Sequence, residues 1–267
     1  MKAVKLAILL SVAFVMSVGL NATDKIKDKD KSGSKVADSG SFGVYLNGKR
    51  VGTETFNITE TLNSDRRPEY STASSEIKFD DGKFKATQTA EIQVAANGEL
   101  RSYNWHATVP QKEDASVELK DQLLVEHLVP ADQKKMDVPH ILPSSTIILD
   151  DNFFSQREVL LWRYLSGCPR QDNGLLCGVT RFVILVPQQH ASGNATLELM
   201  GQEKVTVKGV ERILNKIKLE TSGPQSLTWL NDQSRESDAT QWILWVDDQY
   251  KIIKMTVAGS NIEIVRD

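Results

Sequence analysis

The chain is 267 residues long, with 32 lysines and arginines against 35 aspartates and glutamates, so its formal net charge is −3. This slightly acidic balance excludes a general nucleic-acid binder, which would carry a basic excess. Hydrophobic residues make up 40% of the chain, which is enough for a buried core and too much for global disorder. After one apolar run at the start, no stretch approaches the ~20 residues that span a membrane.

Residues 1–22 have the three parts of a secretory signal peptide. A short segment with two lysines precedes an uncharged apolar run over residues 6–18, and residues 17–19 and 20–22 each offer a cleavage site. We therefore expect cleavage between Gly19 and Ala22 and export to the periplasm, or outside the cell, of a bacterium. An uncleaved membrane anchor is the alternative; after cleavage no transmembrane span is expected.

Residues 23–40 read TDKIKDKDKSGSKVADSG, in which positive and negative charges alternate and small residues follow. Apolar side chains are too few to bury a core here, so we predict a disordered charged linker. The folded part is then expected to be a single antiparallel β domain over residues 41–267, because all-β folds of this length often form one unit.

From residue 41 onward, apolar and polar residues alternate with period two, and turn dipeptides separate the alternating segments. Asn-Gly at 47–48 and 97–98 and Asp-Gly at 81–82 are strong hairpin signals. The pattern is typical of an antiparallel meander with one apolar and one polar face. It predicts strands over residues 42–46, 50–61, 70–79, 83–94, 102–109, 117–119 and 123–129.

The period changes over residues 151–165, where apolar residues recur at helical spacing after Asp and Asn capping candidates. We predict a helix there that is covered on most sides, because more than half of its circumference is apolar. The last third predicts strands again, at 180–186, 195–201, 205–208, 212–221, 227–230, 241–246, 251–257 and 262–265. These elements indicate a mainly β fold, in which one large curved antiparallel sheet, a half-open barrel, wraps around the single mid-chain helix.

Cys168 and Cys177 are the only cysteines, and they flank a short segment with proline and Asn-Gly that can turn back on itself. In an oxidising compartment we expect them to form a disulfide bond. For so short a loop the chain-entropy model gives roughly 2.5–3 kcal/mol of stabilisation. The spacing disfavours a redox motif, and the lack of a nearby histidine disfavours zinc.

No familiar catalytic or metal-binding motif occurs in the sequence. The aspartate pairs at 80–81, 150–151 and 247–248 stand at predicted turns or at the helix start, where aspartate is favoured for local hydrogen bonding. The histidines are scattered, and a solvated or hydrogen-bonded role is favoured for them over a catalytic one. They are His106, His127, His140 and His190. We therefore expect no enzymatic activity, no bound metal and no cofactor.

Large aromatic residues are the most informative side chains for a binding role. Filling the core is their ordinary role, yet a sheet of this size encloses more volume than one helix occupies. The remainder would be an apolar pocket, in which a buried acyl chain gains ~0.8 kcal/mol per CH₂ group. The ligand-binding candidates are Trp105, Phe154, Trp229 and Trp245.

The order of signal peptide, linker, N-terminal meander, helix and C-terminal strands resembles bacterial envelope proteins of unknown function, and in layout the lipoprotein-carrier class (LolA/LolB-like). The resemblance covers residues 41–267 and is most specific at 45–52, 149–154 and 245–255. It implies an incomplete β-barrel that wraps a helix and holds a hydrophobic ligand or an acylated protein. This chain lacks the N-terminal lipid-bearing cysteine of the anchored members.

Two functions remain open at this point. The first is a secreted, non-enzymatic protein that binds a lipid or acyl chain inside a half-open barrel, which requires a cavity. The alternative is an envelope protein–protein interaction module with a fully packed core, which would present an exposed apolar patch or edge strand to a partner.

Overall fold

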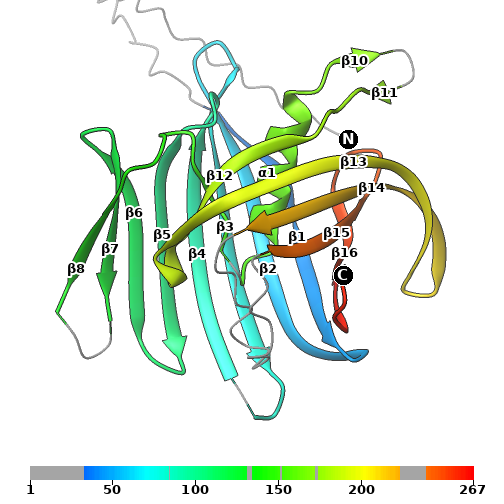
Figure 1. Cartoon of the computed structure of the whole chain (residues 1–267), viewed down its shortest axis with the longest axis horizontal. Coiled ribbons are helices and arrows are strands. Elements are labelled where there is room, and N and C mark those ends of the chain that lie inside the picture. The colour runs from blue at the N-terminus through cyan, green and yellow to red at the C-terminus, as the bar shows by residue number, and fades with distance from the viewer. Residues whose placement is uncertain (1–32, 84, 131–133, 151, 172–173, 223–238) are drawn as a thin grey trace, which may run out of the picture. The chain divides into compact units, whose positions relative to one another are not determined.

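The computed structural model describes residues 33–83, 85–130, 134–150, 152–171, 174–222 and 239–267. The predicted signal peptide, the first part of the predicted linker and the predicted strand at 227–230 lie outside these residues. Residues Ser32–Asp267 form one compact unit, as judged by the contacts among them. Its main feature is a large curved sheet with one helix against its inner face (Figure 1).

Strands β1 to β8 form a first meander, in which each strand pairs antiparallel with the next. Their turns follow from the sequence: Asn47 and Gly48 both have positive φ, at 52° and 75°, the left-handed geometry that a tight Asn-Gly hairpin requires. The strands are β1 (Ser34–Leu46), β2 (Lys49–Leu62), β3 (Pro68–Asp80), β4 (Lys85–Ala95), β5 (Leu100–Val109), β6 (Glu113–Lys120), β7 (Leu123–Val129) and β8 (Met136–His140).

Strands β12 to β17 form a second antiparallel meander. They are β12 (Thr180–Val186), β13 (Ala191–Val207), β14 (Val210–Ser222), β15 (Ala239–Val246), β16 (Ile252–Val257) and β17 (Ile262–Arg266). The last strand pairs antiparallel with the first, from Phe42 opposite Arg266 to Leu46 opposite Ile262. This pairing joins the two meanders into a single sheet of fifteen strands.

Among the described residues, the two edges of this sheet are β8 and β9 (Ile147–Ile148), of which β9 lies parallel to β12. A separate small hairpin is formed by β10 (Arg170–Gln171) and β11 (Gly174–Leu175). The predicted fold class is confirmed: the structure is mainly β, with a large, open, curved antiparallel sheet around one helix.

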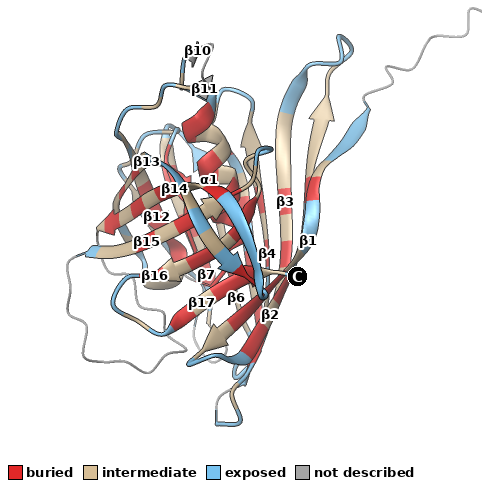
Figure 2. Cartoon of the chain, turned by 90° about the vertical axis from the view of Figure 1, so that its right-hand side faces the viewer, coloured by how far each residue is buried: buried red, intermediate tan, exposed pale blue. Residues whose placement is uncertain are grey.

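The core lies between the inner face of the sheet and the helix α1 (Ser155–Ser166). Burial alternates along the strands, as the bands of buried residues in Figure 2 show. On β5, for example, Tyr103 and Trp105 are buried, whereas Asn104 between them is exposed. The period-two pattern of the sequence therefore marks the inner face correctly.

The predicted linker ends too late, because β1 begins at Ser34 and not after residue 40. Ser34 pairs with Thr61 of β2, and such backbone pairing does not depend on apolar side chains. Asp38 is only 3% exposed although it lies in the charged segment. Its charge is neutralised by Arg266 and Lys251, at 2.7 and 2.8 Å, which no local pattern reveals.

The helix begins at Ser155, four residues after the predicted start at 151. The first turn of the helix is polar yet fully buried. The side of the helix that faces the core therefore includes polar residues as well as the predicted apolar ones. The buried residues of this turn are Ser155, Gln156, Arg157 and Glu158.

Two predicted strands, 195–201 and 205–208, are parts of the one long strand β13. An irregularity between Leu199 and Gly201 bends this strand without ending it, and Gly201 has a φ of 98° there. The alternation of apolar and polar residues does not predict β8 or β9, since β8 contains Pro139 and β9 has two residues.

Candidate functional site

An apolar cavity of about 710 Å³ lies beside the second half of α1. Its walls come from α1, from β2 and β4, from the turn between β4 and β5, and from β9 and β12. The larger apolar residues of the lining are Ile58, Ile92, Val94, Leu100, Ile147, Ile148, Val159, Leu160, Trp162, Leu176 and Phe182. The volume falls within the ~300–1,000 Å³ that small-molecule sites usually have. The cavity thus lies mainly beside the later turns of the helix, and Gln156 of the first turn also reaches its wall.

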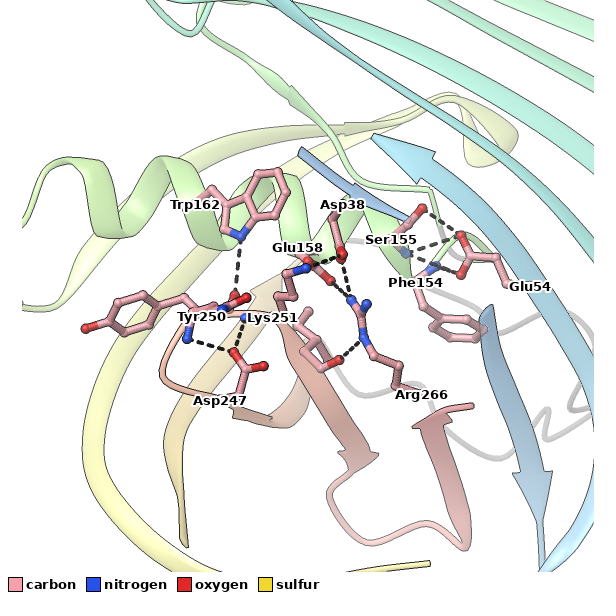
Figure 3. A network of polar contacts seen from close by, with 12 residues as sticks. Asp38, Glu54, Phe154, Ser155, Glu158, Trp162, Asp247, Tyr250, Lys251 and Arg266 are labelled. Atoms are coloured by element: carbon pink, nitrogen blue, oxygen red, sulfur yellow. Dashed lines mark hydrogen bonds and ion pairs between the residues drawn. The ribbon is translucent and has the colours of Figure 1, made fainter. Parts of the chain in front are cut away.

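Two aromatic residues hold the C-terminal half of α1 against its neighbours. The indole Nε1 of Trp162 donates to the carbonyl of Tyr250 at 3.3 Å (Figure 3). The hydroxyl of Tyr164 donates to the carbonyl of Gly178 at 3.0 Å and accepts from the backbone N–H of Leu199 at 3.1 Å. These bonds fix the helix at a distance from the sheet that leaves the cavity between them.

The N-terminus of α1 is capped by a residue far away in sequence, Glu54 of β2 (Figure 3). Its carboxyl oxygens accept from the backbone N–H of Phe154 at 2.8 Å, and from the N–H and hydroxyl of Ser155 at 3.2 and 2.6 Å. The hydroxyl of Ser75 lies 2.7 Å from that of Ser155. Burial raises the pKa of Glu54 to about 7, against the hydrogen bonds that favour its ionised form.

A second polar cluster ties the first turn of α1 to the start of β1 and the end of β17 (Figure 3). The Nη2 of Arg266 donates to Asp38 at 2.7 Å and to Glu158 at 2.6 Å, and Lys251 lies 2.8 Å from Asp38. Burial and the neighbouring Asp38 raise the pKa of Glu158 to about 9 despite Arg266. Although burial opposes it, hydrogen bonds with Glu158, Arg266 and Lys251 hold the pKa of Asp38 well below its usual range. Glu158 is therefore neutral and Asp38 ionised at neutral pH.

A third cluster joins the second meander to the first. Gln188 lies in the turn η1 (Pro187–Gln189), and its amide donates to the hydroxyl of Tyr103 at 2.8 Å and also to Asp150. The Tyr103 hydroxyl in turn donates to Asp150 at 2.5 Å. Burial raises the pKa of Asp150 to about 6 against these hydrogen bonds. The same aspartate accepts from the N–H of Asn152 at 3.0 Å, which is the local role that its position predicted.

The histidines hydrogen-bond to acidic residues, as the favoured interpretation requires. His106 pairs with Asp114, and His127 with Asp137 at 2.7 Å. His140 and His190 share the fully buried Glu126, at 3.0 and 3.2 Å. Sequence order did not indicate this last grouping, because it joins β7, β8 and the turn before β13. No group of three or more His, Cys, Asp or Glu side chains in the described part of the chain is arranged to hold a metal ion.

Cys168 and Cys177 are joined in a disulfide, with Cα atoms 4.8 Å apart, so the predicted pairing is confirmed. Cys168 and the adjacent Pro169 line the cavity, and so does Leu176 next to the second cysteine. The bond therefore constrains one wall of the cavity.

The predicted pocket residues that the structure describes, Trp105, Phe154 and Trp245, do not line this cavity. Trp105 is buried on β5 and lines a separate hollow of about 570 Å³ formed by residues of β2 to β5. Phe154 is fully buried and packs with Trp242, their ring centroids 6.3 Å apart. Trp245 faces the opposite side of β15 and donates to Glu203 at 2.8 Å. Trp229 lies outside the described residues.

The physical reason for this correction is side-chain volume. The rings of Phe154 and Trp242 fill the core near the start of α1, whereas smaller side chains form part of the cavity wall beside Trp162 and Phe182. The turn between β4 and β5 contributes Ala96 and Gly98 to the lining, and β4 contributes Val94 and Ala95. No sequence pattern distinguishes small residues beside a void from small residues in close packing.

Among the residues that the structure describes, no helix is long and apolar enough to cross a membrane. No protein-family model and no curated protein sequence matches the chain. A solved structure similar to it is a β-barrel-like protein with a domain of unknown function, DUF1849, from Brucella abortus. The TM-score is 0.46 and the identity 10%, over 86% of this chain and 94% of that one. The fold assignment rests on the strand order of this chain, and the resemblance to the lipoprotein-carrier class stays a prediction.

Proposed function

We propose that this protein is exported and that it binds a hydrophobic ligand, a lipid or acyl chain, in the cavity beside α1. The observation that carries the proposal is the cavity itself, because its size suits a small molecule and its wall is mostly aliphatic and aromatic. An apolar cavity that stays empty forfeits packing contacts, and an apolar ligand would restore them.

The proposal includes the absence of catalysis. The buried ionisable groups of the described chain bind other parts of the fold: Glu54 caps the helix, and Asp150 bonds with Tyr103 and Gln188. The charged residues that line the cavity are Glu60 and Arg163, which come from different elements. This arrangement favours binding over the paired acid and base that general acid–base chemistry needs. Export is supported by the signal-like sequence of residues 1–22 and by the disulfide.

The test is saturable binding of the neutral apolar fluorophore N-phenyl-1-naphthylamine to the purified exported protein. Val94→Trp places a large ring at the cavity wall, and we expect it to weaken binding about tenfold or more, because it displaces ligand groups worth ~0.8 kcal/mol per CH₂. The matched control is Val210→Trp, since Val210 is exposed on β14 and does not line the cavity.

Native mass spectrometry of the protein as purified from its host checks for a bound lipid directly. The proposal fails if the wild-type protein shows no saturable binding, or if Val94→Trp binds as tightly as Val210→Trp while its thermal unfolding shows that it is folded.

An interaction module is the second candidate, and one observation favours it. Strand β8 is an edge of the sheet in the described chain, and Ile141, directly after it, is 91% exposed. An edge strand presents unpaired N–H and C=O groups with which a strand of a partner can pair. Ile141→Lys would abolish recovery of a partner in a pull-down if this candidate is right, and would leave binding of the apolar fluorophore unchanged.

A further inference from the structure

We propose that the ligand of the cavity is an anionic amphiphile, whose acidic head group binds Arg163 while its apolar chain lies along the cavity. The placement of the ligand's apolar chain in the cavity rests on the proposed function. The head-group half is new, and it rests on the surroundings of Arg163.

Arg163 lines the cavity from the last turns of α1 and is held in place by two carbonyl oxygens. Its Nη1 donates to the carbonyl of Gly98 at 2.6 Å and to that of Ser145 at 3.0 Å. A guanidinium has five N–H donors on three nitrogens. Within the described residues Arg163 donates through Nη1 alone, so Nε and Nη2 are left for a ligand.

No carboxylate of the described chain balances this charge. Burial lowers the pKa of Arg163, and no neighbouring acid counteracts the effect. Two other arginines of the fold do contact acids: Arg266 contacts Asp38 and Glu158, and Arg50 contacts Asp267 at 2.6 Å. A half-buried cation without a counter-charge is unfavourable, and an anionic ligand would remove this penalty.

Two neighbours of Arg163, Gly98 and Thr146, support a head-group site at this position. A Cβ atom at Gly98 would lie 2.7 Å from the Cζ of Arg163, so the glycine allows the guanidinium to lie flat against the β4–β5 turn. Thr146 follows Ser145 directly, lines the cavity and is 2% exposed, yet its hydroxyl has no hydrogen-bond partner in the described protein. A buried hydroxyl is rarely left unpaired, which makes Thr146 a second donor for an acidic head group.

The other charged lining residue does not oppose this assignment. Glu60 lies 3.8 Å from Lys35, which balances its charge. Arg163 is therefore the residue of the cavity wall that selects for charge. Carboxylate and phosphate head groups share the geometry that a guanidinium binds, so a fatty acid and a single-chain phospholipid are both sources of the ligand.

The experiment compares cis-parinaric acid with its neutral methyl ester, which has the same chain, and adds oleoyl lysophosphatidic acid as a competitor. We expect the wild-type protein to bind the acid about tenfold more tightly than the ester, as charge-assisted hydrogen bonds require. Arg163→Met should reduce affinity for the acid about tenfold and change affinity for the ester less than twofold. Thr146→Val should act in the same direction with a smaller effect.

Arg212→Met is the matched control, because it removes the same charge from an exposed position on β14. Unchanged ester binding by Arg163→Met shows that the variant is folded with its cavity intact. Oleic acid serves as a second competitor. If lysophosphatidic acid displaces cis-parinaric acid at a lower concentration than oleic acid does, the preferred head group is a phosphate; if oleic acid displaces it at the lower concentration, the preferred head group is a carboxylate. Both results support the proposal.

Equal affinity of the wild-type protein for acid and ester overturns the head-group assignment and leaves the proposed function standing. Loss of acid and ester alike in Arg163→Met also overturns it, since Arg163 would then only maintain the wall. Failure of the wild-type protein to bind either compound, or N-phenyl-1-naphthylamine, overturns the proposed function and this inference with it.

Discussion

The carboxyl group of Glu54, on β2, caps the helix that begins at Ser155, 101 residues later in the chain. The residue at the N-cap position itself, Phe154, has no side chain that accepts a hydrogen bond. The first N–H groups of a helix have no partner within it, and here they lie in the interior, away from water. One buried acid on the sheet therefore sets where the helix begins and how it is seated.

Two substitutions of Glu54 should distinguish the contribution of its hydrogen-bond acceptors to stability from the contribution of its charge. Glu54→Ala leaves the buried N–H groups of Phe154 and Ser155 without an acceptor, and we expect it to lower the free energy of unfolding by about 2–4 kcal/mol. Glu54→Gln keeps one acceptor oxygen and gains a donor that the hydroxyl of Ser155 can accept. It should lower the free energy of unfolding by less than about 1 kcal/mol. Urea unfolding of both variants at pH 6 measures the difference.

The control for this pair is Glu211→Ala and Glu211→Gln, since Glu211 is an exposed acid that contacts Lys204 at 2.6 Å. Both changes should stay within about 0.5 kcal/mol of the wild-type protein. If Glu54→Ala were as mild as Glu211→Ala, the capping role would be disproved.

The raised pKa of Glu54 also predicts how stability depends on pH. The folded state holds its proton up to about pH 7, whereas an unfolded glutamate releases it near 4.5. Between these values the folded state binds more protons, so its stabilisation is complete below pH 4.5 and is lost as the pH rises through 7. The pKa of Asp150, raised to about 6, acts in the same direction.

We therefore expect the free energy of unfolding to fall between pH 5 and pH 8, with a contribution of about 3 kcal/mol at most from Glu54. Chemical unfolding at pH 5, 6, 7 and 8 measures this slope. Glu54→Gln should flatten it, because an amide does not titrate. A wild-type stability that rises steadily over this range would contradict the prediction.

The parts of this fold that can be predicted from the sequence are those determined by residues close together in the sequence. The alternation over β4 and β5 reports which face is buried, and the Asn-Gly turn at 47–48 needs a left-handed backbone that few residues adopt. The pairing of Cys168 with Cys177 could be predicted from their short separation and from the export that residues 1–22 suggest.

The parts that the sequence does not predict depend on residues brought together from a distance. Asp38 looks like a solvated linker residue until Arg266 is placed beside it, 228 positions away. The cavity is harder still, because it is the space that side chains do not fill. Val94 and Leu160 line it while Ile77 and Leu161 pack in the same core, and nothing in their local sequence separates the two groups.

The two acids that share Arg266 should respond differently to neutralisation. The pKa of Glu158 is raised to about 9, so Glu158→Gln replaces one neutral group by another and should change stability at pH 7 by less than about 1 kcal/mol. Asp38 is ionised there, and Asp38→Asn leaves Arg266 without its charged partner. We expect a loss of about 2–4 kcal/mol. Thermal unfolding of both variants gives the comparison, and equal losses would mean that the proton is not on Glu158.

The disulfide should matter for the cavity as well as for stability. Thiol titration of the denatured exported protein should find no free thiols before reduction. Replacing both cysteines by serine, Cys168→Ser with Cys177→Ser, should lower the free energy of unfolding by about 2–3 kcal/mol, because the unfolded chain regains the freedom of the closed loop.

Since Cys168 and Leu176 line the cavity, the same double variant should also release a bound apolar fluorophore faster than the wild-type protein does. Glu158→Gln is the matched control for this measurement, because it changes a buried residue of α1 outside the cavity wall. A double serine variant that is less stable but releases the fluorophore at the wild-type rate would show that this wall keeps its shape without the bond. The disulfide would then stabilise the fold without shaping the site.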